Sequence, residues 1–124
     1  MFTRDVMLKD IVTAKENITA KEGIELLFKR HVGCIVILDD AQKCRGIFTE
    51  RDAIRIIAQD VPLTAVMEKV MTKNPFTVGV DSTFEEAKNI IVSRKIRHLP
   101  VIDADGKLMG LVSVRHILDA LWGL

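Results

Sequence analysis

The 124-residue sequence has no tyrosine, and its Phe and Trp residues together make up only 5% of the chain. The core must therefore be aliphatic, and there are too few rings for the stacking surfaces that bind single-stranded nucleic acids. Glycine and proline are also scarce, with seven and three residues, which excludes collagen-like and low-complexity chains. A hydrophobic content of 48% excludes intrinsic disorder.

The sequence also lacks an excess of charge of one sign. Eighteen Lys and Arg residues face seventeen Asp and Glu residues, for a net charge of +1. Proteins that bind nucleic-acid backbones usually carry a clear basic excess, so a nucleic-acid partner is not expected. The basic residues Arg94, Lys95 and Arg97 are explained by a solvated helix C-terminus, where cations complement the helix dipole.

No apolar run approaches the roughly 18–20 residues that span a bilayer, and residues 1–10 contain no apolar signal core. The two cysteines, Cys34 and Cys44, are too few to form a disulfide scaffold in a chain of this length. No Cys-x-x-Cys pair is present, so no metal site is expected. These features favour a cytoplasmic protein with no membrane partner.

The chain contains an internal repeat, because a shift of 64 residues, as from Thr19 to Thr83, aligns its halves without a gap. The shift also superimposes Gly46 on Gly110, and the apolar run 35–38 on the run 99–102. Each half is typical of a strand, a helix, two strands and a helix. The expected elements are strands near 12–13 and 76–78, helices beginning at 19 and 83, strands over 34–38 and 99–102, hairpin turns over 39–43 and 103–107, strands ending near 49 and 113, and helices from 50 and 114.

Helical spacing predicts which residues of the first helix in each half face the core. Both helices open with a predicted capping box, Thr19 with Glu22 and Thr83 with Glu86. The expected core-facing residues are Ile24, Leu27, Phe28, Ala87, Ile90 and Ile91.

The predicted fold class is α/β (α+β), with two β-α-β-β-α units packed sheet to sheet around a pseudo-two-fold axis. A unit of about 60 residues buries too little surface to be secure alone, and pairing two units leaves symmetric clefts between them. The predicted division is a first unit over 1–60, a linking helix over 61–69 with Pro62 in its first turn, and a second unit over 70–124.

This doubled unit resembles a tandem pair of CBS domains, named after cystathionine β-synthase, from Val6 to Leu121. The resemblance implies a stand-alone regulatory module rather than an enzyme, with AMP, ADP, ATP or S-adenosylmethionine held in the cleft. AMP is favoured, no other cofactor is expected, and the resemblance also implies homodimers of CBS pairs shaped as a flat disk. The stretches that carry the resemblance are Val32–Ile37, Gly46–Asp52, Ile96–Val101 and Gly110–Ser113.

The family's ligand motif is Gly, an apolar residue, any residue, Thr or Ser, two residues of any kind and Asp. The first half matches it fully, whereas His116 replaces Asp in the second half. The motif sits where a strand meets a helix, so free amides and the positive end of the helix dipole favour an anion. Thr49 could bind a phosphate or ribose oxygen, Arg51 a phosphate, and Asp52 a ribose diol, while Gly46 would let the backbone turn closely. The alternative interpretation is a plain helix cap made by Thr49 and Asp52.

The resemblance implies that each site draws on both halves, with main-chain and apolar groups holding the base. Phe76 or Ile11 would sandwich a purine; alternatively, these apolar residues are simply interface core. The first predicted site comprises Gly33, Cys34, Gly46, Ile47, Thr49, Arg51, Asp52, Met71, Asn74, Pro75, Phe76 and Thr77. The second comprises Met7, Asp10, Ile11, Val12, Thr13, Arg97, His98, Pro100, Ser113, Arg115 and His116.

Two functions are therefore weighed. One is a regulatory module that senses cellular energy through an adenine nucleotide. The other is a dimerisation or docking module with degenerate sites, acting on a separate enzyme or transporter. Catalysis is not expected, because Ser113, His116 and Asp119 follow one another along a single helix instead of converging on a substrate.

Overall fold

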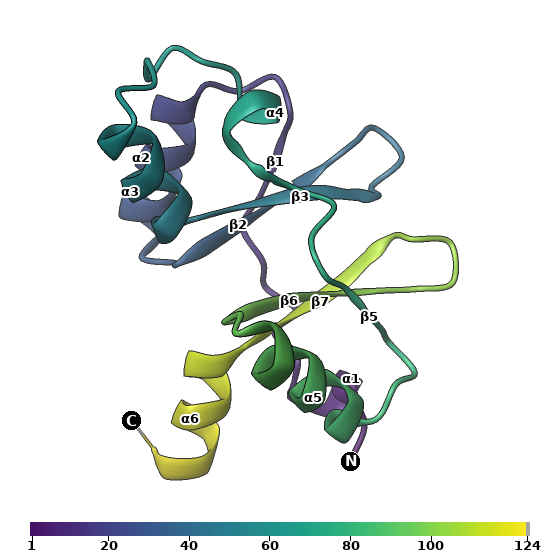
Figure 1. The fold of residues 1–124 in the computed structure, drawn as a ribbon. Coiled ribbons are helices and arrows are strands. Elements are labelled where there is room, and N and C mark those ends of the chain that lie inside the picture. The colour runs from purple at the N-terminus through teal and green to yellow at the C-terminus, as the bar shows by residue number, and fades with distance from the viewer. Residues whose placement is uncertain (124) are drawn as a thin grey trace. The chain divides into compact units, whose positions relative to one another are not determined.

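The chain crosses over between its two halves. In the computed structural model, which describes residues 1–123, the N-terminal segment Met1–Ile11 packs with the chain from Phe76 onward (Figure 1). We call this the terminal unit, and the remaining unit, Val12–Pro75, the central unit. Each unit combines a small sheet with helices, which confirms the predicted mixed fold class and its repeat.

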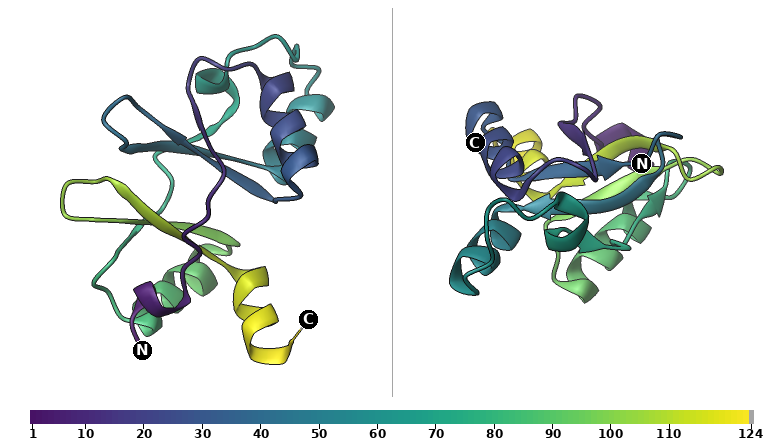
Figure 2. Two further views of the ribbon diagram at one scale, coloured as in Figure 1. Left: turned by 180° about the vertical axis from the view of Figure 1, so that it is seen from behind. Right: turned by 90° about the horizontal axis from the view of Figure 1, so that it is seen from above.

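The central unit contains a four-stranded sheet in the order β1-β2-β3-β4. Strands β1 and β2 pair in parallel, and the other pairs are antiparallel. Helices α2 and α3 lie side by side (Figures 1 and 2). The elements are β1 (Thr13–Lys15), α2 (Ala20–Arg30), β2 (Cys34–Leu38), β3 (Cys44–Thr49), α3 (Glu50–Ala58), α4 (Met67–Val70) and β4 (Thr72–Lys73).

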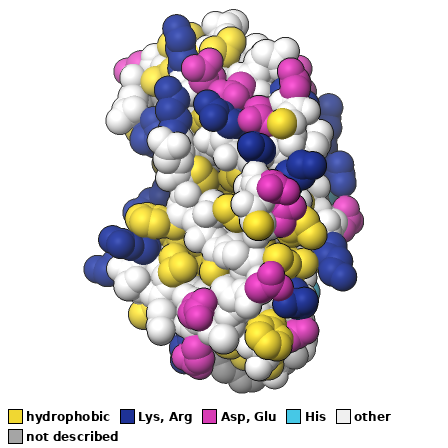
Figure 3. Space-filling view, turned by 90° about the vertical axis from the view of Figure 1, so that its right-hand side faces the viewer, with side chains coloured by type: hydrophobic (Ala, Val, Ile, Leu, Met, Phe, Trp, Pro, Cys, Tyr) yellow, Lys and Arg dark blue, Asp and Glu magenta, His cyan; other side chains and the backbone are white. Residues whose placement is uncertain are grey.

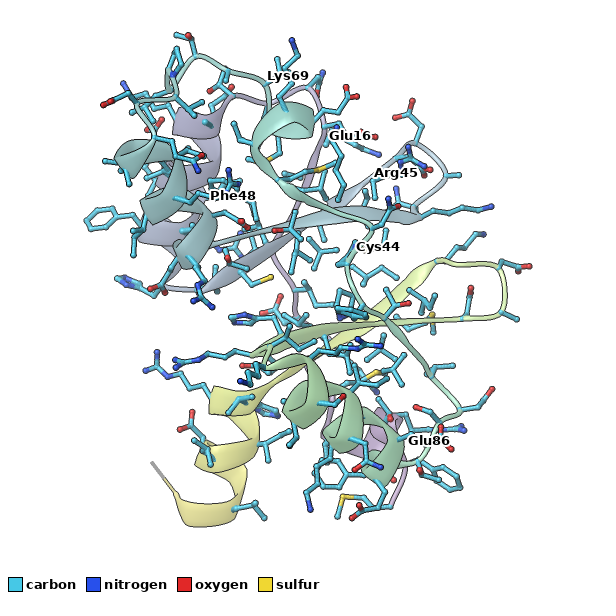
Figure 4. The ribbon with its side chains drawn as sticks, viewed as in Figure 1. Glu16, Cys44, Arg45, Phe48, Lys69 and Glu86 are labelled. Carbon is cyan, nitrogen blue, oxygen red and sulfur yellow. The ribbon has the colours of Figure 1, made fainter. Side chains whose placement is uncertain are left out.

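The core of the central unit follows from strand alternation and helix periodicity. Ile35 and Ile37 join Phe48, which is fully buried and lies close to α2 and α3 in Figure 4. In α2 the predicted capping box is confirmed, since Thr19 and Glu22 bond each other's backbone amides.

The prediction that Phe28 faces the core is wrong, because its side chain is 78% exposed. The buried stripe of α2 runs through Ala20, Gly23 and Leu27. Phe28 is one position beyond Leu27, about 100° further round the helix, which turns it away from the core. The same spacing rule holds in α5, where Ala87 is buried and Ile90 and Ile91 pack on the core.

The terminal unit contains a three-stranded sheet in the order β5-β6-β7, with β5 parallel and β7 antiparallel to β6. Thr83 caps α5 through the Glu86 amide, at 3.2 Å, but the reciprocal half of the predicted capping box is not formed among the described residues, and nothing in the structure explains the difference. The elements are α1 (Thr3–Val6), β5 (Val78–Gly79), α5 (Phe84–Arg94), β6 (His98–Ile102), β7 (Leu108–Ser113) and α6 (Val114–Trp122).

Backbone hydrogen bonds fasten the N-terminal segment to the terminal unit. Leu8 pairs with Leu111 through two N–H···O bonds of 2.8 and 2.9 Å. The Thr3 amide donates to Ser82, and the Phe84 amide donates to Met1. Helix α1 consequently lies against α5 (Figures 1 and 2).

The segment that follows Pro62 is held to the central unit by backbone hydrogen bonds. The linking helix expected over 61–69 is a single turn, Met67–Val70. The residues before it form a turn, because the Ala65 amide donates to Pro62, and the carbonyls of Leu63 and Ala65 accept from the first amides of α2. The structural units thus divide the chain differently from the repeat: 1–11 joins the later half, and 61–75 stays with the earlier one.

Candidate functional site

The ligand motif lies where β3 ends and α3 begins, within the central unit. Thr49 has extended backbone angles and caps α3, and its hydroxyl accepts from the Asp52 amide at 3.2 Å. Asp52 stands in the first helical turn and is only 6% exposed. A carboxylate in this place is favoured by the positive end of the helix dipole.

Both carboxylate oxygens of Asp52 accept hydrogen bonds from the protein. Oδ2 accepts from the Thr49 amide at 3.0 Å and from the Thr49 hydroxyl at 3.1 Å. Oδ1 accepts from the Thr72 hydroxyl at 2.9 Å and from Arg55 Nη2 at 3.4 Å. The same Arg55 nitrogen donates to the carbonyl of Val70, the last residue of α4, at 2.6 Å. Asp52 therefore joins the first turn of α3 to the segment that contains α4 and β4.

The amides at the start of α3 are less available than the sequence suggests. The Thr49 amide donates to Asp52, the Glu50 amide donates to the Gly33 carbonyl at 3.1 Å, and the Asp52 amide donates to Thr49. These three amides are therefore bonded rather than free, because a complete capping box and the preceding loop use them. The helix-cap interpretation is confirmed, and ligand binding would have to use this turn as a capped structure.

Gly46 is needed for close packing rather than for a turn. It lies inside β3, paired with Lys73 of β4. A Cβ atom on Gly46 would stand 2.6 Å from Met71 Sδ and 2.8 Å from the Thr72 carbonyl oxygen. Only a residue without a side chain allows β4 to lie so close to β3. Gly46 thereby places Thr72 within reach of Asp52.

Cys34 pairs with Thr49 across β2 and β3 and is buried. Burial raises the pKa of the Cys34 thiol well above its ordinary value, and the negative charge of Asp52 raises it further. Burial likewise raises the pKa of Cys44 to about 11. Both cysteines are free, and both remain neutral thiols near pH 7, so neither is an activated nucleophile.

Most residues of the first predicted site lie in the central unit. Gly33 lies directly before β2, Cys34 is the first residue of β2, and Met71 is buried beside Gly46. Asn74 follows β4 with a positive φ of 48°, a conformation that asparagine tolerates. Ile47, Arg51 and Pro75 belong to the same unit, with Arg51 exposed on α3.

Phe76 and Thr77 of the first predicted site belong to the terminal unit instead. Phe76 is 48% exposed, and the Arg94 guanidinium lies over its ring at 4.7 Å from the centroid. This cation–π contact covers one face of the ring, so a purine could stack on Phe76 only at the opposite face unless Arg94 moved.

The second predicted site falls mainly in the terminal unit and differs chemically from the first. The Val114 amide donates to Arg97, matching the bond from Glu50 to Gly33, but Ser113 makes no capping bond to α6. Gly110 repeats the close approach of Gly46, since a Cβ there would stand 2.5 Å from Met7 Sδ and 2.9 Å from the Leu8 oxygen. The site's remaining members in this unit are Asp10, Ile11, His98, Pro100, Arg115 and His116, whereas Val12 and Thr13 belong to the central unit.

The hydrogen-bond network around Asp52 is replaced as a whole in the terminal unit. At the repeat positions of Asp52, Arg55 and Thr72, the terminal unit has His116, Asp119 and Leu8. A neutral histidine offers one acceptor where a carboxylate offers two oxygens, and leucine offers no hydroxyl. The two units thus share their backbone arrangement but not their polar chemistry.

Sequence reasoning did not identify Arg55 or Thr72 as parts of the site. The signal for Arg55 was available, because a cation three residues after an acid lies on the same helix face. Thr72 gave no such signal, since its bond to Asp52 depends on the pairing of β4 with β3.

The charge distribution fits a few local contacts better than a broad binding surface. On the face drawn in Figure 3, Lys and Arg side chains are interspersed with Asp and Glu. Ion pairs such as Arg45 with Glu16, at 3.5 Å and labelled in Figure 4, join opposite charges at the surface.

Within residues 1–123, no group of three or more His, Cys, Asp or Glu side chains could hold a metal ion, and no helix is long and apolar enough to cross a bilayer.

A family model described as the CBS domain matches the chain twice, over residues 4–59 and 66–123. An uncharacterized 17.7 kDa protein of Acidianus ambivalens is 33% identical over 111 residues, which cover 90% of this chain and 67% of that protein. An uncharacterized protein of Methanopyrus kandleri is 32% identical over 93% of this chain and 60% of its own length. An inosine-5′-monophosphate dehydrogenase of Aquifex aeolicus is 30% identical over 90% of this chain, which spans only 23% of that enzyme.

Solved structures match over almost the whole chain. A CBS domain pair in complex with 5′-methylthioadenosine and S-adenosyl-L-methionine superimposes with a TM-score of 0.89 at 26% identity, covering 99% of this chain and 97% of that one. A CBS domain protein of Pyrobaculum aerophilum complexed with AMP gives a TM-score of 0.87 at 25% identity, covering 94% and 89%.

Proposed function

The chain belongs to the CBS domain family, and from that premise we propose that it is a regulatory module that binds an adenosyl ligand at the first turn of α3. The ligands in the two similar structures, AMP, 5′-methylthioadenosine and S-adenosyl-L-methionine, all carry an adenosine with a ribose diol. The observation that carries the proposal is the buried carboxylate of Asp52 at the N-terminal end of α3. An ionised carboxylate only accepts hydrogen bonds, which suits a pair of hydroxyl donors.

AMP remains the favoured ligand, and an energy-sensing role follows from that choice. Thr49 and the dipole of α3 would face the 5′-substituent, and Arg51, exposed on the first turn, would contact a phosphate. The enzyme relatives share only part of their length with this chain, and we propose a role without catalysis, exerted on a separate enzyme or transporter. The cytoplasmic location expected from the sequence stays a prediction.

Thermal denaturation tests the proposal directly. AMP at 100 times its dissociation constant should stabilise the protein by about 2.7 kcal/mol, which corresponds to a rise in melting temperature of about 10 °C for a chain of this size. GMP serves as the control, because it carries the same ribose and phosphate with a different base. The proposal fails if AMP, ADP, ATP and S-adenosylmethionine all leave the melting temperature unchanged at millimolar concentration.

A second candidate function, dimerisation, is favoured by apolar side chains that lie exposed on the helices. Phe28 and Ile57 are 78% and 61% exposed, and at the same repeat positions Val92 and Leu121 are each 67% exposed. A pattern that repeats in both units suits a self-complementary interface with a second copy of the chain, because two-fold interfaces pair a surface with itself. We propose such a homodimer as the assembly through which the module acts.

Light scattering coupled to size exclusion measures this assembly. At tens of micromolar the parent protein should have twice the mass of one chain, and Phe28→Glu together with Ile57→Glu should reduce it to a single chain. Met109→Glu is the matched control, since Met109 is an exposed apolar residue of β7 rather than of a helix. A parent protein that stays monomeric at every concentration would rule out the homodimer.

A further inference from the structure

The geometry points to Asp52 as a shared acceptor, for which a ribose diol competes with the segment Met67–Lys73, so that ligand binding loosens this segment. We call Met67–Lys73, which comprises α4 and β4, the α4–β4 segment. The inference rests on the proposed function, and adds to it the part of the protein that changes when the ligand binds.

One oxygen of Asp52 is committed to the helix cap. Oδ2 accepts from both the amide and the hydroxyl of Thr49. The amide cannot leave without unwinding the start of α3, because Thr49 also accepts from the Asp52 amide. A carboxylate oxygen has two lone pairs, so Oδ2 has no free position for a ligand.

The other oxygen of Asp52 is held by the α4–β4 segment. Oδ1 accepts from the Thr72 hydroxyl at 2.9 Å and from Arg55 at 3.4 Å. Arg55 belongs to α3 but is tied to the same segment by its 2.6 Å bond to the Val70 carbonyl. Both donors at Oδ1 therefore either belong to the α4–β4 segment or are bonded to it, so replacing them removes contacts between this segment and α3.

A ribose diol brings two hydroxyl donors to a carboxylate whose acceptor positions are full. It can bind Asp52 only by replacing donors at Oδ1, and these are the exposed Thr72 side chain and the longer contact from Arg55. The rest of the segment keeps independent anchors, since the Met67 amide donates to Ile18 at 2.7 Å and Met71 packs on Gly46. Ligand binding would therefore loosen the end of the segment around Thr72 and leave α4 in place.

Among its described residues, the terminal unit has no equivalent of this shared acceptor. Its short helix α1 is bonded to Ser82 through the Thr3 amide. Leu8, two residues beyond this helix, is held by backbone bonds to Leu111 and has no hydroxyl to exchange. His116 and Asp119 stand where Asp52 and Arg55 stand in the central unit. Any change produced by diol binding is thereby restricted to the α4–β4 segment.

Calorimetric titration of the full chain with AMP tests the competition. Thr72→Val removes the hydroxyl donor while keeping the shape of the side chain, and should tighten AMP binding about tenfold, since a hydrogen bond to a charged group contributes about that factor. Thr72→Ser keeps the hydroxyl and should bind as the parent does. Thr64→Val is the matched control on an exposed threonine of the turn before α4. Weaker or unchanged binding of AMP by Thr72→Val would overturn the inference.

Hydrogen exchange distinguishes competition at Asp52 from a purely structural role of Thr72. Only competition makes the exchange rate depend on the ribose diol of the ligand. AMP should raise amide exchange at Thr72 and Lys73 of the parent, whereas 2′,3′-dideoxy-AMP, which lacks the diol, should not. In Thr72→Val these amides should already exchange faster, and AMP should add little. Equal exchange with both nucleotides would contradict competition at Asp52. If no variant binds AMP at all, the proposed function itself fails, which is a distinct result from AMP binding without competition.

Discussion

Deletion of residues 1–11 should unfold the terminal unit while the central unit keeps its structure. The deletion removes both backbone bonds between Leu8 and Leu111, the bond from Phe84 to Met1, and the fully buried Thr3. Thr3 donates to the Thr83 carbonyl at 3.1 Å and bonds Ser82. At about 1 kcal/mol for each hydrogen bond, the loss is on the order of 4–5 kcal/mol, against a total stability of about 5–15 kcal/mol for a typical protein.

Hydrogen exchange followed by mass spectrometry measures this effect for each unit separately. Protection should disappear from β5, β6 and β7, and persist in β2 and β3. Leu8→Pro tests the same contact with one substitution, because proline cannot donate to Leu111, and Lys9→Pro is the control on the exposed neighbour. If protection is lost first from the strand that follows the deletion, β1, the structural division of the chain is refuted.

Asp52→Ala should reduce both the stability of the central unit and its affinity for AMP. The change leaves four donor groups, two on Thr49 and one each on Arg55 and Thr72, without their acceptor. Loss of the cap and of these bonds should lower the free energy of unfolding by roughly 2–4 kcal/mol. Affinity for AMP should fall by roughly 10–100-fold, because a hydrogen bond to a charged group is worth about 1.5–3 kcal/mol.

Two comparisons separate these effects. Asp52→Asn keeps the shape and one acceptor oxygen, so it should recover part of the stability, while its neutral amide should still bind AMP weakly. His116→Ala changes the same repeat position in the terminal unit and should alter AMP binding much less. Chemical denaturation gives the stabilities and calorimetry gives the affinities. Asp52→Ala binding AMP as the parent does would show that the ligand does not use this carboxylate.

The features that sequence predicted well depend on neighbours along the chain. In both hairpin turns an aspartate accepts from amides two and four residues ahead: Asp39 from Ala41 and Lys43, and Asp103 from Asp105 and Lys107. Such local bonds are encoded in a few residues. The bond from Lys43 also lowers the pKa of Asp39, which keeps it ionised as an acceptor. The helix starts at Thr19, Thr49 and Thr83 are local in the same sense.

The features that sequence missed depend on residues distant in the chain. Phe28 matches the helical spacing, but the packing of α2 on Phe48 and Met67 decides which side is buried. The exchange of segments between units has no local signature, because Leu8 finds Leu111 only once β7 exists. The motif singled out Thr49 and Asp52, which bond each other in the structure, whereas their link to Thr72 required the pairing of β4 with β3.

The pairing of Leu8 with Leu111 also sets an order of events during synthesis. The central unit is complete as soon as residue 75 has left the ribosome, because all its elements lie between Val12 and Pro75. The N-terminal segment is made earlier, yet its partners follow much later: first Ser82 and Phe84, and then Leu111. Leu111 is translated roughly 5–20 s after Leu8 at about 5–20 residues per second. Residues 1–11 therefore complete their contacts only after all the elements of the central unit have been made.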